Sequence, residues 1–382
     1  MVRNALLPLL SFPGLLAAQG FVNSYGGNLA QDGVGVAITP NGFCVGVRSF
    51  GIEPSRHFGQ TLMTSAGGSI QEWNTLSDPP GKLFLQVLTG NNDGDLFLAG
   101  SIVAPDGYAH DGFIEKRTGD NSVQWTTVPA VAGNEQYFAL APLADGGVVA
   151  CGIRENGGGH DAWVSRFSAS GTLLWSTAVD GGYEEEAYGV AVSGNDILIT
   201  GRQLNFGGTS DALFARLDGN GTLVWTTAWG GVANDIGRAI VPLDNGNFLM
   251  AGTTNSFGTF DITEGRIKDH VYLVAIDLIG DSLWTGAVGD TINDHRGYGL
   301  HRADNNDLFV SGERGDVPGE TDALVQRLDA SGTLLWERAW HTGKEDRLVQ
   351  VHALTDGFIA CGWAFTEASR QVLLVRRNAD GN

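Results

Sequence analysis

The stretch DALFARLDGNGTLVW, residues 211–225, decides the fold, because versions of it return along the whole chain. It joins an alternating strand (DALFARL) to a turn (DGNG) and to a second strand that reaches a tryptophan. The tryptophan recurs at spacings of 52, 50, 50, 59 and 52 residues, at Trp73, Trp125, Trp175, Trp225, Trp284 and Trp336. A period of about 50 residues held over so much of a chain indicates a repeat architecture.

A second marker has the same period. Seven hydrophobic stretches end in a glycine, at Gly46, Gly100, Gly152, Gly201, Gly252, Gly312 and Gly362. Residues 181–229 divide into four short strands with hairpin-type turns between them, which makes one up-and-down sheet. Such a sheet cannot bury both of its faces alone, and radial repetition buries them. The pattern therefore predicts a β-propeller.

The two markers also predict how the ring closes. There are seven glycine markers, but only six tryptophans follow them. The missing outer strand is supplied by residues 21–27 (FVNSYGG), which align with residues 225–231 (WTTAWGG) and place Phe21 in the tryptophan position. We therefore predict an all-β fold: one seven-bladed β-propeller over residues 19–382, with four-stranded antiparallel blades. Residues 21–26 complete the last blade and close the ring.

A third-strand pattern repeats with the blades. An acid lies 14 residues before the tryptophan at Asp111, Asp161, Asp211 and Asp322, and a basic residue follows five residues later at Lys116, Arg166, Arg216 and Arg327. A feature present in most blades is expected to tie loops to strands. The three cysteines, Cys44, Cys151 and Cys361, are expected to be buried thiols, because equivalent strands of separate blades lie too far apart for a disulfide.

The repeat resembles a known family. The run GGVAND at 230–235, the run DNGNFLMAGT at 244–253 and the run DALFARLD at 211–218 are similar to the exported bacterial seven-bladed β-propeller repeat (SBBP-type) proteins. The resemblance covers residues 21–382. It implies the fold but no activity, because the family has no agreed catalytic set.

Composition and the N-terminus limit the partners and the location. The chain has 382 residues, and 43 acidic residues against 23 basic ones give a formal charge of −20. Such a surface repels nucleic acid and anionic lipid. Arg3, the apolar run 5–16 and Ala17-Ala18 are typical of a signal peptide over residues 1–18. No later stretch is long enough to span a membrane. We expect an exported protein that is secreted, periplasmic or at the cell surface.

The candidate binding residues are acidic and follow the inter-blade glycines. They are Glu184, Glu185, Glu186, Asp235, Asp294, Glu345 and Asp346. In a propeller they share one face with the loops between second and third strands, including a long insertion at 255–269. They could hold Ca²⁺, which takes six to eight oxygen ligands, or meet a basic partner, or form a solvated rim whose members accept hydrogen bonds from neighbouring backbone amides.

The sequence predicts no catalytic residue and no required cofactor. It has no Gly-x-Ser-x-Gly motif, phosphate loop or dinucleotide fingerprint. The inner-strand segments, such as 35–38 and 139–141, offer mostly small apolar residues. The leading hypothesis is a monomeric binding or scaffold module, without enzymatic activity, for a protein or glycan at the cell surface. The alternative is an enzyme acting on polysaccharides, with carboxylates from different blades converging at the channel. Whether the protein is an enzyme stays open.

Overall fold

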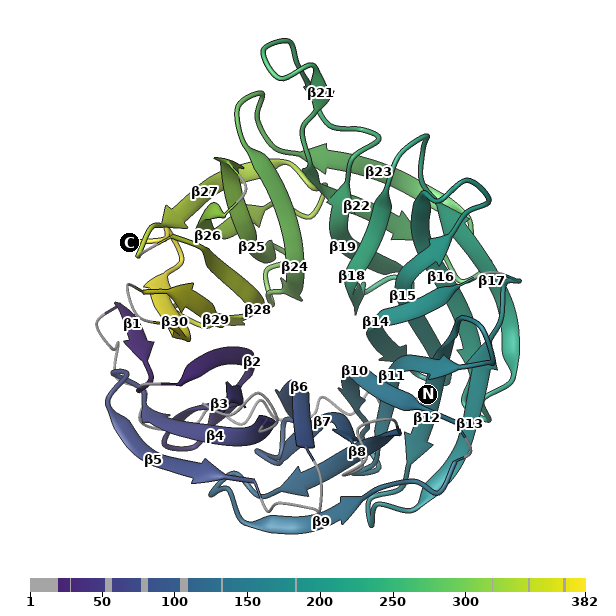
Figure 1. Cartoon of the computed structure of the whole chain (residues 1–382), viewed down its shortest axis with the longest axis vertical. Helices are drawn as coiled ribbons and strands as arrows, with labels where there is room; N and C mark the ends of the chain where they lie inside the picture. Colours follow the sequence, from purple (N-terminus) through teal and green to yellow (C-terminus); the bar gives the residue numbers. More distant parts are fainter. Residues whose placement is uncertain are drawn as a thin grey trace, which may run out of the picture.

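The structure is a computed structural model, and it forms a ring of seven four-stranded antiparallel sheets around a central opening (Figure 1). It describes residues 20–27, 29–51, 57–76, 82–103, 109–131, 133–182, 184–317, 319–342, 344–366 and 369–382. The predicted signal peptide, residues 1–18, lies outside the described residues. Seven blades of four strands confirm the predicted fold class.

The strands of the first four blades follow one another along the chain. Blade 1 comprises β2 (Ala30–Thr39), β3 (Gly42–Phe50), β4 (His57–Ser65) and β5 (Ile70–Thr75). Blade 2 comprises β6 (Lys82–Gly90), β7 (Leu96–Val103), β8 (His110–Arg117) and β9 (Val123–Thr127). Blade 3 comprises β10 (Glu135–Pro142), β11 (Val148–Glu155), β12 (His160–Phe167) and β13 (Leu173–Val179). Blade 4 comprises β14 (Glu185–Ser193), β15 (Asp196–Leu204), β16 (Ser210–Asp218) and β17 (Leu223–Trp229).

The last three blades contain the insertion and the ring closure. Blade 5 comprises β18 (Asp235–Pro242), β19 (Phe248–Thr254), β22 (His270–Ile276) and β23 (Ser282–Val288), with the small hairpin β20 (Phe260–Asp261) and β21 (Arg266–Ile267) inserted. Blade 6 comprises β24 (Asp294–Arg302), β25 (Leu308–Val317), β26 (Glu320–Leu328) and β27 (Leu334–Trp340). Blade 7 comprises β28 (Asp346–Leu354), β29 (Gly357–Phe365), β30 (Arg370–Asn378) and β1 (Phe21–Tyr25).

The N-terminal strand closes the ring as predicted. β1 pairs antiparallel with β30, and the register aligns Val22 with Val375 and Tyr25 with Val372. A Cβ on Gly68, in the outer turn of blade 1, would lie 3.0 Å from the Phe21 ring. In the same way, a Cβ on Gly221 would lie 2.6 Å from the Trp175 ring. Phe21 therefore occupies the tryptophan position, in contact with the next blade.

The repeated tryptophans join each blade to the next. Four of them donate a hydrogen bond from Nε1 to a carbonyl in the outer turn of the following blade: Trp125 to Ala169, Trp175 to Gly219, Trp225 to Leu278 and Trp336 to Ala379. Arg216 of the third-strand pattern bonds the same Leu278 carbonyl at 2.8 Å and pairs with Asp196 of its own blade at 2.7 Å. The basic residues of this pattern therefore connect turns, as expected.

The hydrophobic core lies between the blades. Each of seven buried clusters mixes residues from two adjacent sheets; Cys151 of blade 3, for example, packs with Ile199 and Leu213 of blade 4. The three cysteines are buried and free, which confirms their expected role. Among the described residues, no helix is long and apolar enough to cross a membrane.

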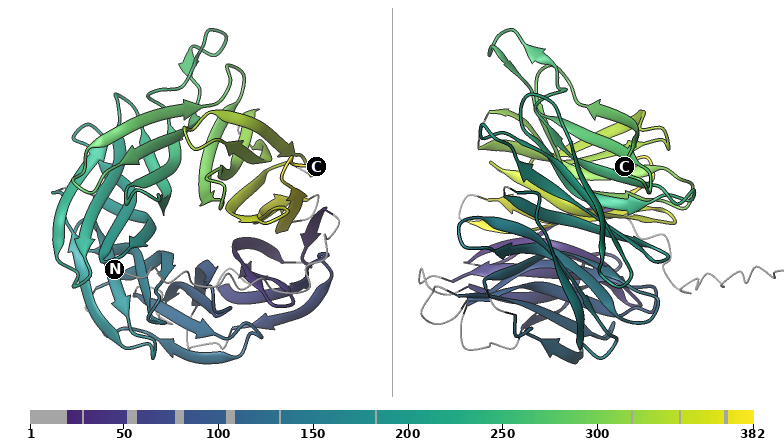
Figure 2. Two further views of the ribbon diagram at one scale, coloured as in Figure 1. Left: turned by 180° about the vertical axis from the view of Figure 1, so that it is seen from behind. Right: turned by 90° about the vertical axis from the view of Figure 1, so that its right-hand side faces the viewer.

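The ring has two faces. We call one the turn face, because the turns between first and second strands and between third and fourth strands lie there, as at 194–195 and 219–222 in blade 4. The link face holds the inter-blade links, such as 230–234, and the loops between second and third strands, such as 205–209. The insertion hairpin of blade 5 projects on the link face, and Figure 2 shows it standing clear of the ring.

Candidate functional site

Three of the predicted acidic residues are buried within the links. Glu185, Asp235 and Asp346 each begin an innermost strand and are fully buried. Asp235 accepts hydrogen bonds from the Gly231 backbone N–H at 2.7 Å and from Ser256 Oγ at 2.6 Å. Asp346 accepts the Thr342 backbone N–H at 2.5 Å in the same way. Hydrogen bonds to backbone amides agree with the rim alternative, and a binding role for these three residues stays a prediction.

Asp294 joins the insertion to blade 6. Both of its oxygens accept hydrogen bonds from the Arg266 guanidinium at 2.8 Å, and one accepts the Asp269 backbone N–H at 2.9 Å. Burial acts to raise the pKa of Asp294, but the bonds from Arg266 and Asp269 and the charge of Arg296 hold the pKa below its ordinary value. Asp294 therefore stays ionised and fixes the base of the hairpin that Arg266 belongs to.

The other predicted residues, Glu184, Glu186 and Glu345, lie at two different links. Glu186 pairs with Arg202 at 2.8 Å and accepts the hydroxyl hydrogen bond of Tyr188. Glu184 and Glu345 are half-buried, and each lines a separate cleft. The structure does not bring the predicted residues together at one point, because each link ends at a different blade around the ring.

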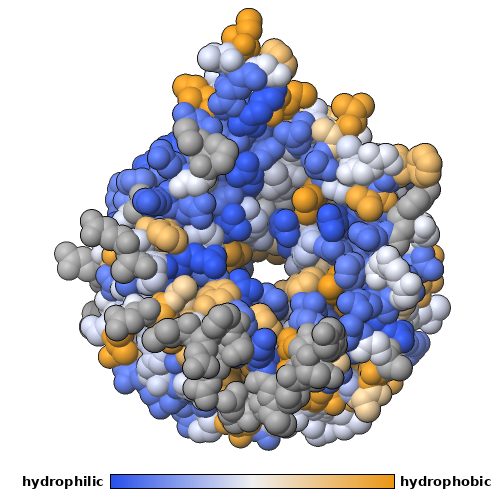
Figure 3. Space-filling model, viewed as in Figure 1, coloured by the Kyte–Doolittle hydropathy of each residue, from blue (hydrophilic) through white to orange (hydrophobic). Residues whose placement is uncertain are grey.

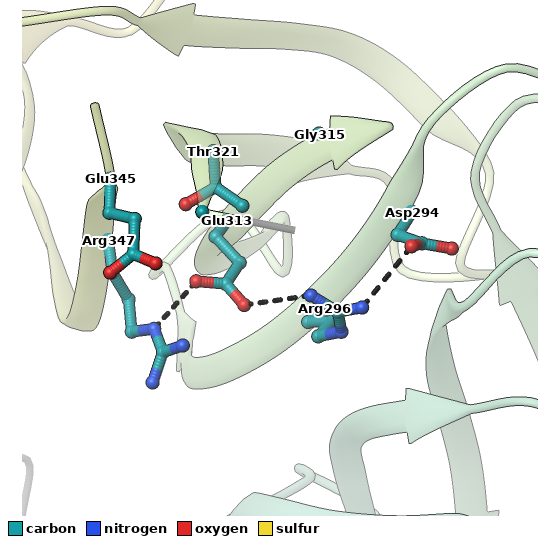
Figure 4. A pocket seen from close by; sticks show the side chains of 8 residues that line it. Asp294, Arg296, Glu313, Gly315, Thr321, Glu345 and Arg347 are labelled. Atoms are coloured by element: carbon teal, nitrogen blue, oxygen red, sulfur yellow. Dashed lines mark hydrogen bonds and ion pairs between the residues drawn. The ribbon is translucent and has the colours of Figure 1, made fainter. Parts of the chain in front are cut away.

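The cleft beside Glu345 lies between blades 6 and 7 and has a volume of about 200 Å³. Four of its five charged side chains form one chain of ion pairs, which Figure 4 shows as dashed lines. Glu313 accepts hydrogen bonds from Arg347 at 2.7 Å and from Arg296 at 3.2 Å, and Arg296 also donates to Asp294 at 3.2 Å. The fifth, Glu345, lies outside this chain, so the cleft has three acids against two bases.

The cleft beside Glu184 lies between blades 3 and 4 and has a volume of about 460 Å³. Near it, the carboxylates of Asp161, Asp180 and Glu185 place oxygen atoms within 4.8 Å of one another. Burial, reinforced by the charge of Asp180, raises the pKa of Asp161. Three oxygens are fewer than the six to eight that Ca²⁺ takes. A calcium ion therefore stays a prediction.

Sequence reasoning missed a ring of side chains in the channel. Every innermost strand has a β-bulge, which adds one unpaired residue and redirects its side chain. The seven bulge residues are half-buried and occupy one equivalent position: Val34, Gln86, Phe138, Tyr188, Arg238, Tyr298 and Val349. The expectation of mostly small apolar inner residues is wrong for blades 3 to 6, where three aromatic residues and an arginine take this place.

The marker glycines account for the bulges. A Cβ on Gly201 would lie 1.7 Å from the Glu186 carbonyl oxygen, and one on Gly252 would lie 1.9 Å from that of Ile236. Glycine is needed because the bulged inner strand approaches the second strand too closely for a side chain. The bulge residues lie 12 to 14 residues before these glycines in the sequence. This narrow range of offsets was the signal that could have found them.

The aromatic and basic side chains stack along the channel wall. The Arg238 guanidinium lies 4.3 Å from the centroid of the Tyr188 ring and 5.7 Å from that of Tyr298. The Arg347 guanidinium lies 4.4 Å from the Tyr298 ring and 5.3 Å from the Trp363 ring. Side chains of blades 4 to 7 thus form a continuous ladder of cation–π contacts. Figure 3 shows the channel open at the centre of the link face.

The tyrosine hydroxyls of this ladder are held by acids. Tyr298 donates to Glu313 at 3.1 Å, and Tyr188 donates to Glu186. Burial, together with the charge of Glu313, raises the pKa of Tyr298 to about 12. Tyr298 therefore remains neutral at ordinary pH and presents its ring and not a phenolate to the channel.

Exposed apolar side chains gather on the link face of blades 4 to 6. They are Phe206 in a loop of blade 4, Val232 and Ile292 in links, and Phe257, Phe260 and Ile262 in the insertion. The most exposed are Phe206, Val232 and Ile262, at 92%, 90% and 89%. Figure 3 shows hydrophobic groups on the hairpin at the top of the view and on the loops to its right.

Comparisons with known proteins show the fold alone. No model of a protein family matches the chain, and no curated protein matches it. Solved structures do match. A protein of unknown function from Dyadobacter fermentans is 14% identical over 94% of this chain and 98% of its own, with a TM-score of 0.56. An ulvan lyase, described as a new family of polysaccharide lyase, is 11% identical over 94% of this chain and 96% of its own, with a TM-score of 0.53.

A third match is a protein complex. Sqt1 of Chaetomium thermophilum, bound to the N-terminus of ribosomal protein L10, is 12% identical over 93% of this chain and 98% of its own, with a TM-score of 0.51. The matches thus include a binding protein and an enzyme on one architecture. A shared fold at such low identity does not transfer a function.

Proposed function

We propose that the protein is a binding module that takes a segment of a protein partner on the link face of blades 4 to 6. The observation that supports it is the group of exposed apolar side chains there, above all Phe206, Val232 and Ile262. Exposed apolar groups on one face are a feature of protein interaction sites, because water leaves them favourably on association.

The scaffold suits this role. The insertion that presents Phe260 and Ile262 is held at its base by the Arg266–Asp294 pair, and Lys268 is fully buried with Glu264 at 2.7 Å. A loop held in this way loses less conformational entropy when a partner binds. The match to Sqt1, which binds the N-terminus of another protein, supports the idea that this architecture accepts a peptide segment.

The polysaccharide enzyme is less well supported. It needs two acids directed at one substrate, whereas Glu185, Asp235 and Asp346 are buried in three separate links. The proposal keeps the expectations that the protein is exported, monomeric and similar to SBBP-type proteins. It also keeps the cell surface as the place where the partner is met.

The test compares two sets of exposed apolar residues in affinity capture from the envelope fraction, with quantitative mass spectrometry. The link-face variant is Phe206→Ser, Phe260→Ser and Ile262→Ser. The matched control is Leu174→Ser, Val224→Ser and Leu283→Ser, whose side chains are about half exposed on the outer strands, at 52%, 49% and 49%. We expect one partner to be enriched by the wild type and the control and lost by the link-face variant. Equal capture by all three proteins would overturn the proposal.

A further inference from the structure

Arg238 is a channel residue whose charge has no partner. Among the described residues, no carboxylate lies within ion-pair distance of its guanidinium, and its buried Nε has no hydrogen-bond acceptor. Burial lowers the pKa of Arg238, and the charges of Arg347 and Arg202 act in the same direction, whereas Tyr298 and Glu186 oppose the shift. A half-buried cation without an ion-pair partner is unfavourable in the free protein.

The nearest acids are already engaged. Both oxygens of Glu186 are used, one by Arg202 and the other by the Tyr188 hydroxyl. Glu313 accepts from Tyr298, Arg296 and Arg347. Neither acid is free to neutralise Arg238 without giving up its present partners.

Two tyrosine rings flank the Arg238 guanidinium, with centroids 4.3 Å and 5.7 Å from its central carbon. The N–H donors of a guanidinium lie in one plane, and its Nε has no acceptor here. Planar donors of this kind match the two oxygens of a carboxylate. The site is therefore rigid before a ligand arrives.

We propose that Arg238, between Tyr188 and Tyr298, binds the single carboxylate of a mainly apolar peptide segment that enters the channel from the link face. This inference rests on the proposed function and deepens it, because it states which group of the partner segment the channel recognises. The carboxylate is either an Asp or Glu side chain or the terminal carboxylate of the partner chain.

Charge favours a peptide over a polyanion. A polyuronate or a nucleic acid brings a negative charge with every residue and is repelled by a protein of charge −20. A peptide brings one carboxylate among apolar residues. Exposed apolar side chains for such residues lie on the same face, on loops of blades 4 and 5, such as Phe206 and Phe257.

The experiment measures binding of defined probes by NMR at low salt, using the Arg238 Nε–Hε signal, which is assigned by its absence in Arg238→Lys. The probes are acetyl-Leu-Glu-Phe-amide, the same tripeptide with Gln in place of Glu, acetyl-Leu-Phe-Glu with a free C-terminus, and a tetragalacturonate. We expect saturable binding of at least one Glu peptide and none of the Gln peptide. Comparison of the two Glu peptides distinguishes a side-chain carboxylate from a terminal one.

Three variants sharpen the result. Arg238→Gln should lower the affinity for the Glu peptide by about 10-fold or more, which is the effect expected from losing a charge-assisted hydrogen bond. Arg238→Lys should recover part of the affinity, because it keeps the charge without the planar fork. Arg338→Gln removes the same charge from β27 on the outer rim and should leave the affinity unchanged.

Three outcomes would overturn the inference: unchanged affinity in Arg238→Gln, no saturable binding of either Glu peptide at millimolar concentration, or tighter binding of tetragalacturonate than of the peptides. The probes do not depend on the captured partner. If the peptides bind as expected but the link-face variant still captures every protein, the carboxylate site stands and the proposed function fails. If the capture experiment succeeds and Arg238→Gln changes nothing, the proposed function stands alone.

Discussion

One turn of the turn face is the same in every blade, whereas the link face differs from blade to blade. In all seven blades the same backbone hydrogen bond closes the turn that follows the third strand, from Ser65 N–H to the Ser69 carbonyl in blade 1 to Asn378 N–H to the Asn382 carbonyl in blade 7. On the link face, the loop between second and third strands has five residues in blade 4, at 205–209, and fifteen in blade 5, at 255–269.

The difference reflects which contacts hold the ring together. On the turn face, four of the six repeated tryptophans and three third-strand arginines donate hydrogen bonds to the neighbouring blade, so a change in one blade disturbs the next. On the link face, Asp235 and Asp346 accept hydrogen bonds from backbone N–H groups of the links that precede them. Loops there are free to vary without opening the ring, and we therefore look for function on that face.

The largest effect is expected from removing a turn-face tryptophan. Trp225→Ala loses packing against the core between blades 4 and 5 and the hydrogen bond to Leu278. Urea denaturation should show a free energy of unfolding lower by about 3–5 kcal/mol. The link-face control Phe206→Ala removes a side chain that is 92% exposed. It should change the free energy of unfolding by less than about 0.5 kcal/mol. Equal losses in the two variants would contradict the distinction between the faces.

The second largest effect is expected from replacing a marker glycine with alanine. In Gly201→Ala the new Cβ would overlap the Glu186 carbonyl oxygen, so the strands must separate, and we expect a loss of about 2–3 kcal/mol. The control is Gly158→Ala, because a Cβ there meets no atom within 4 Å. The measurement is again urea denaturation. If both variants were as stable as the wild type, the close approach of the two strands would not be what requires glycine.

A buried link acid should have a smaller effect. Asp235→Ala leaves the Gly231 N–H and the Ser256 hydroxyl without their acceptor, which should cost about 1–3 kcal/mol by thermal or urea unfolding. Glu184→Ala, in a half-buried residue on the rim of a cleft, is the control and should be nearly neutral. Unchanged stability in Asp235→Ala would show that this carboxylate is not needed to hold the link, and would favour the binding role that the sequence suggested.

The smallest effect is a pH dependence. Burial is the main cause that raises the pKa of Glu135 to about 7, with Arg154 opposing and Asp111 adding to it. Between its unfolded value near 4.5 and about 7, the folded state holds the proton that the unfolded state releases, so this residue lowers stability as pH rises. The slope is at most about 1.4 kcal/mol per pH unit.

The variant Glu135→Gln removes that titration. Its stability relative to the wild type should therefore increase from pH 5 to pH 7 by urea denaturation. Parallel curves for the two proteins would show that Glu135 has the same proton affinity in the folded and unfolded states.

The amino-acid sequence by itself determined the blade count and the closure, because every blade repeats one set of contacts. Trp225, Gly201 and Arg216 recur at fixed offsets, and a periodic signal can be read without knowing any distance. The sequence also placed the candidate acids on the correct face, since strand direction alternates from one strand to the next.

Only the tertiary structure decided which side chains meet. Glu185, Asp235 and Asp346 look alike in the sequence as exposed acids, yet each is buried by its own link. Tyr188, Arg238 and Tyr298 lie 50 and 60 residues apart and differ in chemistry, so no periodic pattern of residue type marks them. They meet because the ring brings the bulges of adjacent innermost strands to one height in the channel, and that proximity depends on how the blades pack.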